Sequence, residues 1–226
     1  MLQKINSNSN LKFRNEVLGI LKYKKIISDD FFDLERLHEH ISPDMCIDQD
    51  WPSGRTTISL LFFDQDISNI YDNFIYSIYE ILGYDFYFQK IPTIRVHCPE
   101  ENIDDDFRFW HNDTDFGHPP EELNIWISLT ENKECSFEIL DSEDNIKEVN
   151  SNLDSFLFFD DGSNDVVKHS YRPVINETRV SIETRINPKE KYVSGYVGTG
   201  RMKAEFKPGG CFGYDKKLAS EIFNEV

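Results

Sequence analysis

Apolar residues recur at helical intervals in two segments near the start of the chain. Over 31–41 the apolar positions are Phe32, Leu34, Leu37 and Ile41. Over 67–82 they are Ile67, Ile70, Tyr71, Phe74, Ile78 and Leu82. This spacing predicts a helix in each segment, and Gly83 is expected to end the second one. The polar segment 6–10 is expected to be a frayed start.

After Gly83 the apolar period changes to two, which is typical of β-strands. Apolar and polar residues alternate over 91–97, 122–130 and 178–186. Segment 156–159 is apolar throughout and predicts a fully buried strand. The polar faces of the alternating strands carry Arg, His, Asn and Trp, which suit a lined pocket better than a plain solvent face.

These elements predict a mainly β protein with N-terminal helices. One sheet face would pack on the two helices and the other would line a cavity, as in a β-sandwich or jelly roll. We expect a single domain over 1–226. Within it, 1–88 would support the sheet, 89–186 would form the core, and 187–226 would be a Gly- and aromatic-rich segment.

Composition narrows the possible functions. The chain has 226 residues with 24 basic and 41 acidic side chains, a net charge of −17, and 39% apolar residues. An apolar content this high excludes overall disorder, and the negative charge disfavours nucleic acid and anionic membranes as partners. The sequence has no apolar run long enough to span a membrane and no signal-peptide core. Its four scattered cysteines suggest neither a zinc site nor a disulfide scaffold. We therefore expect a cytoplasmic protein, and the sequence leaves its oligomeric state open.

Three residues spread over two parts of the sequence are candidate metal ligands. His111 and Asp113 are two residues apart, so an extended chain would place them on one face. This pair alone is common in soluble proteins. A second histidine, His169, follows 58 residues after His111. Two imidazoles and one carboxylate on one face of an Fe(II) ion leave three positions open for a bidentate co-substrate and O2.

Arg179 and Ser181 complete the motif ten and twelve residues after the second histidine. A guanidinium is planar, always charged and able to donate two parallel hydrogen bonds, so it suits the far carboxylate of a dicarboxylate. Ser181 would share a strand face with Arg179 and could complete the clamp.

With this pattern the sequence resembles the Fe(II)/2-oxoglutarate-dependent oxygenases, which have a double-stranded β-helix (jelly-roll, cupin-like) core. Within them it is most similar to the bacterial streptomycin-biosynthesis StrG-type branch. The resemblance is carried by 91–97 (IPTIRVH), 111–118 (HNDTDFGH), 122–130 (ELNIWISLT), His169 and 178–181 (TRVS). Ser170 stands where a glycine commonly follows the distal histidine.

The resemblance implies roles for five residues. His111, Asp113 and His169 would hold iron, and Arg179 with Ser181 would bind the C5 carboxylate of 2-oxoglutarate. The reaction would consume O2 and most commonly hydroxylate the substrate.

Other polar residues are candidates for the same pocket. Asn124 could bind 2-oxoglutarate or a metal-bound oxygen, and Trp126 could form a wall of the pocket or simply fill space. Arg95 could bind an anionic substrate or pair with Glu122 and Asp115. His118 could contact substrate or stack on proline. Arg185 shares a face with Arg179 and is expected to form an ion pair at the rim.

The sequence thus predicts an Fe(II)- and 2-oxoglutarate-dependent hydroxylase. Its substrate would be a small polar metabolite, such as a sugar, nucleotide sugar or amino-acid derivative in antibiotic or surface-glycan biosynthesis. A cupin-like metalloenzyme that does not use 2-oxoglutarate and a non-catalytic jelly-roll module that binds glycans stay open. Residues 195–214 are expected either to close over the site or to strap the outer sheet.

Overall fold

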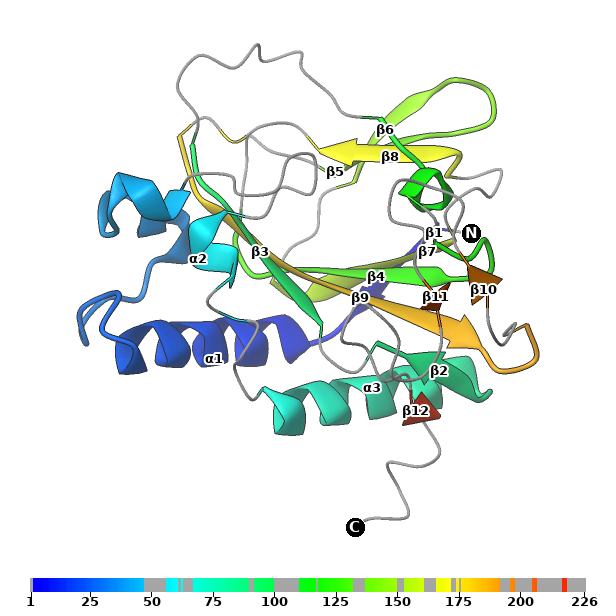
Figure 1. The fold of residues 1–226 in the computed structure, drawn as a ribbon, viewed down its shortest axis with the longest axis horizontal. Coiled ribbons are helices and arrows are strands. Elements are labelled where there is room, and N and C mark those ends of the chain that lie inside the picture. Colours follow the sequence, from blue (N-terminus) through cyan, green and yellow to red (C-terminus); the bar gives the residue numbers. More distant parts are fainter. Residues whose placement is uncertain are drawn as a thin grey trace.

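The protein is described from a computed structural model, which presents two larger antiparallel sheets, a separate two-stranded pair and a helical layer (Figure 1). The described residues are 2–46, 56–60, 62, 67–89, 92–99, 110–116, 118–131, 137–149, 153–160, 166–171, 174, 176–191, 196–197, 205–206 and 217–218. Helices α1 (Ser9–Tyr23) and α3 (Ser68–Leu82) lie side by side beneath the main sheet, and the smaller sheet lies above it. Antiparallel sheets with N-terminal helices confirm the predicted fold class at this level.

The main sheet has seven strands in the order β1-β7-β4-β9-β2-β12, and β3 also pairs with β9. Their bounds are β1 (Leu2–Asn6), β2 (Phe86–Phe88), β3 (Thr93–His97), β4 (Leu123–Ser128), β7 (Ser155–Asp160), β9 (Arg179–Pro188) and β12 (Lys217–Leu218). Strand β9 is the longest and has neighbours on both sides along its length. The predicted strands at 91–97, 122–130, 156–159 and 178–186 are therefore confirmed as β3, β4, β7 and β9.

The small sheet has the order β6-β5-β8, with bounds β5 (Phe137–Leu140), β6 (Ile146–Val149) and β8 (Lys168–Tyr171). A separate pair joins β10 (Tyr196–Val197) to β11 (Glu205–Phe206). The short helices are η1 (Leu34–Glu39), η2 (Pro43–Cys46), α2 (Thr57–Leu60) and η3 (Asp113–Phe116). Most of the segment 195–214 lies outside the described residues, so its role as a lid or strap stays a prediction.

Strand alternation divides the core into two clusters on opposite faces of the main sheet. The larger cluster packs the even-numbered β9 residues Val180, Ile182 and Ile186 against the helices. The smaller cluster lies between the two sheets and consists of Trp126, Phe137, Ile139, Leu157, Phe159 and Val166. The prediction that one sheet face packs on helices is confirmed, whereas a cavity lined by the other face stays a prediction.

The N-terminal segment differs from the prediction. Residues 6–10 are not frayed, because β1 pairs with β7 and α1 begins at Ser9. Asn10 is fully buried and its side-chain amide donates to the carbonyls of Ser128 (2.9 Å) and Ser155 (2.7 Å). A polar residue at this position therefore joins the helix to two strands rather than marking a solvated end.

The second helix is confirmed, whereas the first is wrong in type and extent. Helix α3 ends at Gly83, whose φ of 70° is the left-handed conformation that favours glycine. Segment 31–41 forms only the 3-10 helix η1, and Phe32 of its predicted apolar stripe is 76% exposed. The carbonyl of Glu35 accepts the backbone N–H of Thr178 (2.7 Å), so a tertiary contact replaces a bond of the regular α-helical pattern.

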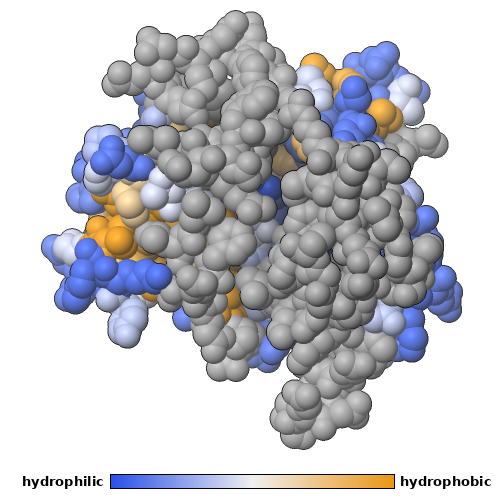
Figure 2. Space-filling view, viewed as in Figure 1, coloured by the Kyte–Doolittle hydropathy of each residue, from blue (hydrophilic) through white to orange (hydrophobic). Residues whose placement is uncertain are grey.

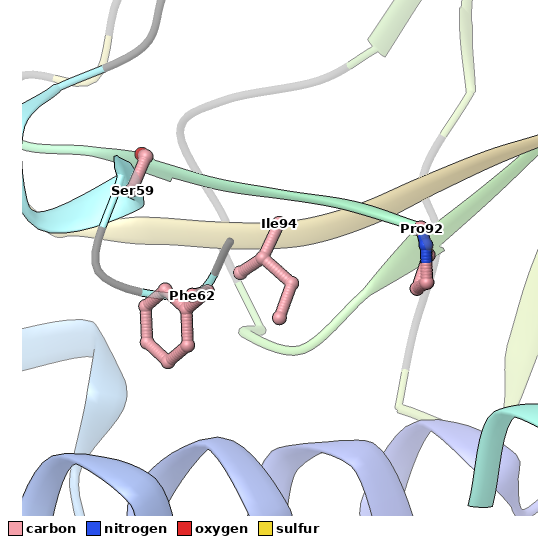
Figure 3. A pocket seen from close by; sticks show the side chains of 4 residues that line it. All are labelled: Ser59, Phe62, Pro92 and Ile94. Atoms are coloured by element: carbon pink, nitrogen blue, oxygen red, sulfur yellow. The ribbon is translucent and has the colours of Figure 1, made fainter. Parts of the chain in front are cut away.

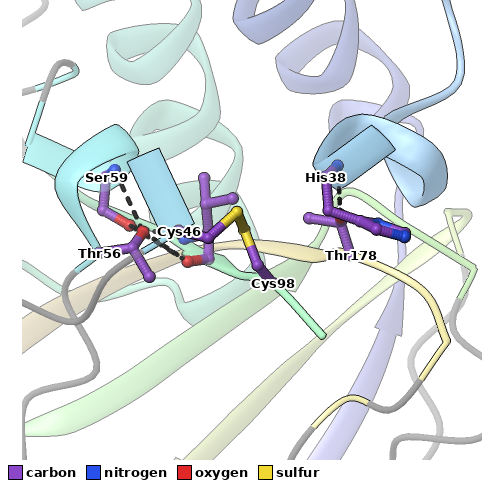
Figure 4. The surroundings of a disulfide bond; sticks show 7 residues. His38, Cys46, Thr56, Ser59, Cys98 and Thr178 are labelled. Carbon is purple, nitrogen blue, oxygen red and sulfur yellow. Dashed lines mark hydrogen bonds between the residues drawn. A yellow bond between two sulfur atoms is a disulfide. The ribbon is translucent and has the colours of Figure 1, made fainter. Parts of the chain in front are cut away.

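Helix α2 covers the outer edge of β3. The hydroxyl of Thr56 donates to the Val96 carbonyl (2.7 Å), and the Val96 N–H donates to the hydroxyl of Ser59 (2.8 Å), as Figure 4 shows in part. These bonds satisfy backbone groups that an edge strand would otherwise expose. A pocket beside them, lined by Ser59, Phe62, Pro92 and Ile94, has a volume of about 10 Å³ (Figure 3). It has room for about one water molecule and none for a metabolite.

One disulfide joins Cys46 of η2 to Cys98 just after β3 (Figure 4). The cysteine spacing did not predict it, because the partners are 52 residues apart and only the tertiary fold brings them together. Disulfides are rare in the cytosol. The cytoplasmic location therefore stays a prediction.

The surface of the described residues agrees with the acidic composition. Among the coloured residues of Figure 2, hydrophilic ones lie chiefly along the edges of this face, and apolar ones gather at the left. The exposed large apolar residues are Leu11, Tyr23, Phe32, Ile81, Tyr84 and Ile146. None of the helices in the described part of the chain is both long and apolar enough to cross a membrane.

Candidate metal centre

His111, Asp113 and His169 come together at one point of the structure. One potential ligand atom from each lies within 4.8 Å of the other two. The Nε2 atoms of His111 and His169 are each 3.9 Å from Oδ1 of Asp113. The two imidazole rings have centroids 4.2 Å apart. The three residues that the sequence singled out as candidate ligands therefore form one cluster.

Backbone pairing places the two histidines. His111 donates its N–H to the carbonyl of His169 (3.1 Å) and accepts the N–H of His169 in return (2.9 Å). Residues that exchange both bonds in an antiparallel pair lie directly opposite and point their side chains to the same face. The isolated bridge thus extends the small sheet beyond β8 and sets the two imidazoles side by side.

Asp113 reaches the cluster by a turn rather than along an extended chain. It is the first residue of η3, and the side-chain oxygen of Asn112 accepts the N–H of Thr114 (2.9 Å) at the start of this turn. The Asn112 amide also donates to the carbonyl of Val167 (3.1 Å) near β8. The extended conformation expected for 111–113 is therefore wrong, although the proximity that it predicted is present.

The carboxylate of Asp113 is buried and ionised. Only 7% of the residue is exposed, and Nε and Nη2 of Arg185 donate to its Oδ2 at 3.2 and 3.0 Å. Burial by itself would raise the pKa of Asp113, but the Arg185 guanidinium and the nearby histidines outweigh it and hold that pKa well below its usual range. A buried carboxylate kept ionised among imidazoles is suited to binding a cation.

The contact between Arg185 and Asp113 corrects an expectation. Arg185 was expected to form an ion pair at the rim. It does form an ion pair, but its side chain is only 14% exposed and its partner belongs to the ligand cluster. The sequence did indicate the face on which Arg185 lies. Arg185 and Arg179 are both odd-numbered residues of β9, so their side chains leave the same face of the sheet. The partner could not be read from the sequence, because Asp113 is 72 residues away.

Glu122 and His118 extend this network outward. Nδ1 of His118 lies 2.9 Å from Oε2 of Glu122, which in turn lies 3.9 Å from Nε of Arg185. Glu122 is 4% exposed. His118 was predicted either to contact substrate or to stack on proline, and the structure gives it a buried acidic partner that neither alternative included.

Arg179 and Ser181 begin strand β9 on the same sheet face as Arg185. Both are buried, at 3% and 1% exposure, and β3 places His97 opposite Arg179 and Arg95 opposite Ser181. The hydroxyl of Ser181 is buried without a hydrogen-bond partner among the described residues. Burial, together with the charges of Arg179 and Arg95, lowers the pKa of His97 well below its usual value, so this imidazole is neutral at pH 7.

The remaining candidates lie on the same face. Asn124 lies opposite Arg185 in the register of β4 and β9. Trp126 stacks on Phe137 (centroids 5.4 Å, 27°), which stacks in turn on the imidazole of His169 (5.5 Å, 20°). Arg95 pairs with Glu183 (2.7 Å), an acidic residue that was not weighed from the sequence. Phe137 was not singled out, because nothing in its local sequence marks a contact to His169.

The donor set fits a metal such as Fe(II). Two imidazoles and one carboxylate with open positions are typical of non-haem Fe(II) sites, whereas structural zinc sites are closed by four ligands. Within the described part of the chain, this is the one group of three or more His, Cys, Asp or Glu side chains placed to share an ion. The residues present therefore satisfy the ligand requirements that the sequence pattern implied.

Comparison with known proteins supports the resemblance. No protein-family model matches the chain. The chain is 34% identical over 109 residues to the streptomycin biosynthesis protein StrG of Streptomyces griseus, which confirms the expected similarity. The match covers 47% of this chain and 49% of StrG, so the chain spans about half the length of the curated relative it matches.

A solved structure also overlaps with much of the chain. It is a prolyl hydroxylase in complex with a hypoxia inducible factor oxygen degradation domain peptide fragment from Trichoplax adhaerens. The overlap covers 84% of both chains at a TM-score of 0.49 and 13% identity. At this level of similarity it carries no weight for the activity of this chain.

Proposed function

We propose that the protein is an Fe(II)- and 2-oxoglutarate-dependent oxygenase that hydroxylates a small polar metabolite. The observation that carries the proposal is the convergence of His111, Asp113 and His169, three side chains of the type and geometry that Fe(II) oxygenases use. When bound, the iron with 2-oxoglutarate and O2 supplies the oxidising chemistry. The chain's own part is to hold the ligands, orient both substrates and exclude water.

The strand connectivity supports a jelly-roll core. From β3 onward, the chain passes back and forth between the two sheets. The main sheet receives β3, β4, β7 and β9. The small sheet receives the bridge at His111 between β3 and β4, then β5 and β6 between β4 and β7, and β8 between β7 and β9. This is the distribution expected of eight strands wound into two facing antiparallel sheets. The cluster lies where the small sheet and η3 face strand β9.

Arg179 and Ser181 are the proposed site for the far carboxylate of 2-oxoglutarate. A buried guanidinium and a buried hydroxyl lie two residues apart on one strand face, so they can bind one anion together. His97 lies opposite Arg179 and is neutral, so the positive charge that would meet the carboxylate at this position comes from the guanidinium and not from an imidazolium.

The aromatic stack shields the inner side of the cluster. Trp126, Phe137 and Phe159 fill the space between the sheets beside His169. A water-excluded wall strengthens the electrostatic interactions made inside the site and limits side reactions. The polar residues Glu122 and Asn124 lie beside Arg185, and His118 contacts Glu122.

The proposed substrate class follows from the relative and from charge. StrG carries a name from streptomycin biosynthesis, which supports a small metabolite such as a sugar, nucleotide sugar or amino-acid derivative. A net charge of −17 disfavours polyanionic substrates such as nucleic acid.

The test combines metal content with product analysis. Anaerobically prepared protein should take up about one Fe(II) per chain. It should then form succinate from 2-oxoglutarate in an O2-dependent reaction. Asp113→Ala should abolish both, whereas Asp154→Ala, which removes an exposed carboxylate at the edge of β7, should change neither.

Two outcomes would replace the proposal with the alternatives weighed from the sequence. Iron uptake without succinate formation would indicate a metalloenzyme that does not use 2-oxoglutarate. Failure to bind any divalent metal would indicate a non-catalytic module.

A further inference from the structure

The two oxygens of the Asp113 carboxylate have different neighbours. Oδ2 accepts hydrogen bonds from both Nε (3.2 Å) and Nη2 (3.0 Å) of Arg185. Oδ1 lies 3.9 Å from Nε2 of His111 and from Nε2 of His169. One oxygen is therefore bound to a guanidinium and the other faces the imidazoles.

Arg185 is itself held in place. It lies within β9, opposite Asn124 of β4, and its side chain is 14% exposed. Glu122 lies 3.9 Å from the same Nε and contacts His118 at 2.9 Å. A guanidinium that faces two buried carboxylates can turn away from Asp113 only by giving up charge-assisted hydrogen bonds.

We propose that Arg185 is a positioning residue that makes Asp113 a one-oxygen metal ligand. The proposal rests on a metal binding at the cluster, as the proposed function requires. Carboxylates bind metals through one oxygen or through both. An oxygen that already accepts two hydrogen bonds from a guanidinium is turned away from the ion, so only Oδ1 is left to coordinate.

The number of coordinating oxygens decides what else the ion can bind. Three protein donor atoms leave three positions of a six-coordinate ion, which accommodate a two-donor co-substrate together with O2. A second oxygen from Asp113 would leave two positions, and the co-substrate alone would fill them. Arg185 would thus preserve the position that O2 needs.

Coordination number is a better readout of this role than metal affinity. The positive charge of Arg185 repels a divalent cation while its hydrogen bonds orient the ligand, so the two effects on affinity oppose one another. The number of metal-bound waters depends only on how many positions the protein occupies.

The experiment counts waters on Mn(II) bound to the whole protein, using the magnetic relaxation of water protons. Wild-type protein should hold three exchangeable waters on the ion, and Arg185→Met should hold two. Arg36→Met is the matched control, because Arg36 pairs with Glu39 at the exposed surface of η1, and it should hold three.

A second variant guards against misfolding. Arg185→Met leaves Glu122 buried with one partner fewer, which can destabilise the fold. Arg185→Met combined with Glu122→Gln removes that charge and should also hold two waters. Adding 2-oxoglutarate should then displace two waters from the wild-type ion and leave one, whereas in either variant none should be left.

Three waters in both Arg185 variants would overturn the proposal. Uptake of Mn(II) by the wild-type protein without water loss on addition of 2-oxoglutarate would speak against the proposed function alone. The comparison of wild type with variants would still decide the role of Arg185. No uptake of Mn(II) by the wild-type protein would overturn both.

Discussion

Replacing Arg179 tests the proposed co-substrate site most directly. The residue opens β9 with 3% of its surface exposed, and the Ser181 hydroxyl follows it on the same face. Arg179→Ala removes a charge and a two-pronged donor from a buried position. Arg179→Lys keeps the charge but loses the planar fork, so it separates the two contributions.

The size of the effect follows from burial. Truncating one partner of a buried, hydrogen-bonded charge pair costs about 2–5 kcal/mol. At about 1.4 kcal/mol per tenfold change, Arg179→Ala should weaken 2-oxoglutarate binding by a factor of about 30 to several thousand. The affinity of Arg179→Lys for 2-oxoglutarate should lie between those of Arg179→Ala and the wild-type protein. Metal binding should persist in both, because Arg179 is not among the residues that form the ligand cluster.

The assay is anaerobic calorimetry of 2-oxoglutarate binding to protein loaded with Mn(II). Arg36→Ala, an arginine lost from the exposed surface, serves as the control and should bind like wild type. Thermal unfolding of each metal-free variant checks that the fold is retained. Binding by Arg179→Ala within threefold of wild type would refute the assignment and move the carboxylate site elsewhere on the strand face.

Three further predictions concern stability and are measured by urea unfolding. Asn10→Ala should lower the free energy of unfolding by about 2–4 kcal/mol, because the buried carbonyls of Ser128 and Ser155 lose their amide donor. A decrease below about 0.5 kcal/mol would contradict this account. Gly83→Ala should lower the free energy of unfolding by about 1 kcal/mol. The φ of 70° is the cause, since an added Cβ meets no atom within 4 Å. An unchanged stability would show that the helix end adapts. Burial and two neighbouring arginines lower the pKa of His97 in the folded protein. As the pH falls through about 6.5, His97 therefore becomes protonated in the unfolded chain but not in the native state. Stability should therefore decrease below that pH, and His97→Gln should reduce the slope; identical slopes would exclude His97 as the cause.

The main strands were predictable because their pattern is local. In β9 every second residue faces the helices, so period two alone separated Val180 and Ile182 from Arg179 and Ser181. The predicted ligand cluster depended on a motif rather than on periodicity. Asp113 reached the expected place by a turn, which the alternating pattern could not indicate.

What the sequence could not predict depends on contacts between distant residues. The helix expected at 31–41 is shortened because the Glu35 carbonyl bonds to the N–H of Thr178, 143 positions further along the chain. The pairing of Arg185 with Asp113 likewise requires β9 and η3 to be adjacent. Such contacts leave no periodic signature, so only the assembled fold reveals them.

The alternation of faces along β9 has a consequence for how this protein can change during evolution. Residues that hold the sheet to the helices and residues that face the candidate site occupy alternate positions of one strand. Substitutions at 180, 182 and 186 act mainly on folding free energy, whereas those at 181, 183 and 185 act mainly on chemistry. Selection can therefore alter the candidate site through one set of positions while the other set keeps the scaffold folded. Variant libraries that probe the candidate site should be confined to the odd-numbered positions.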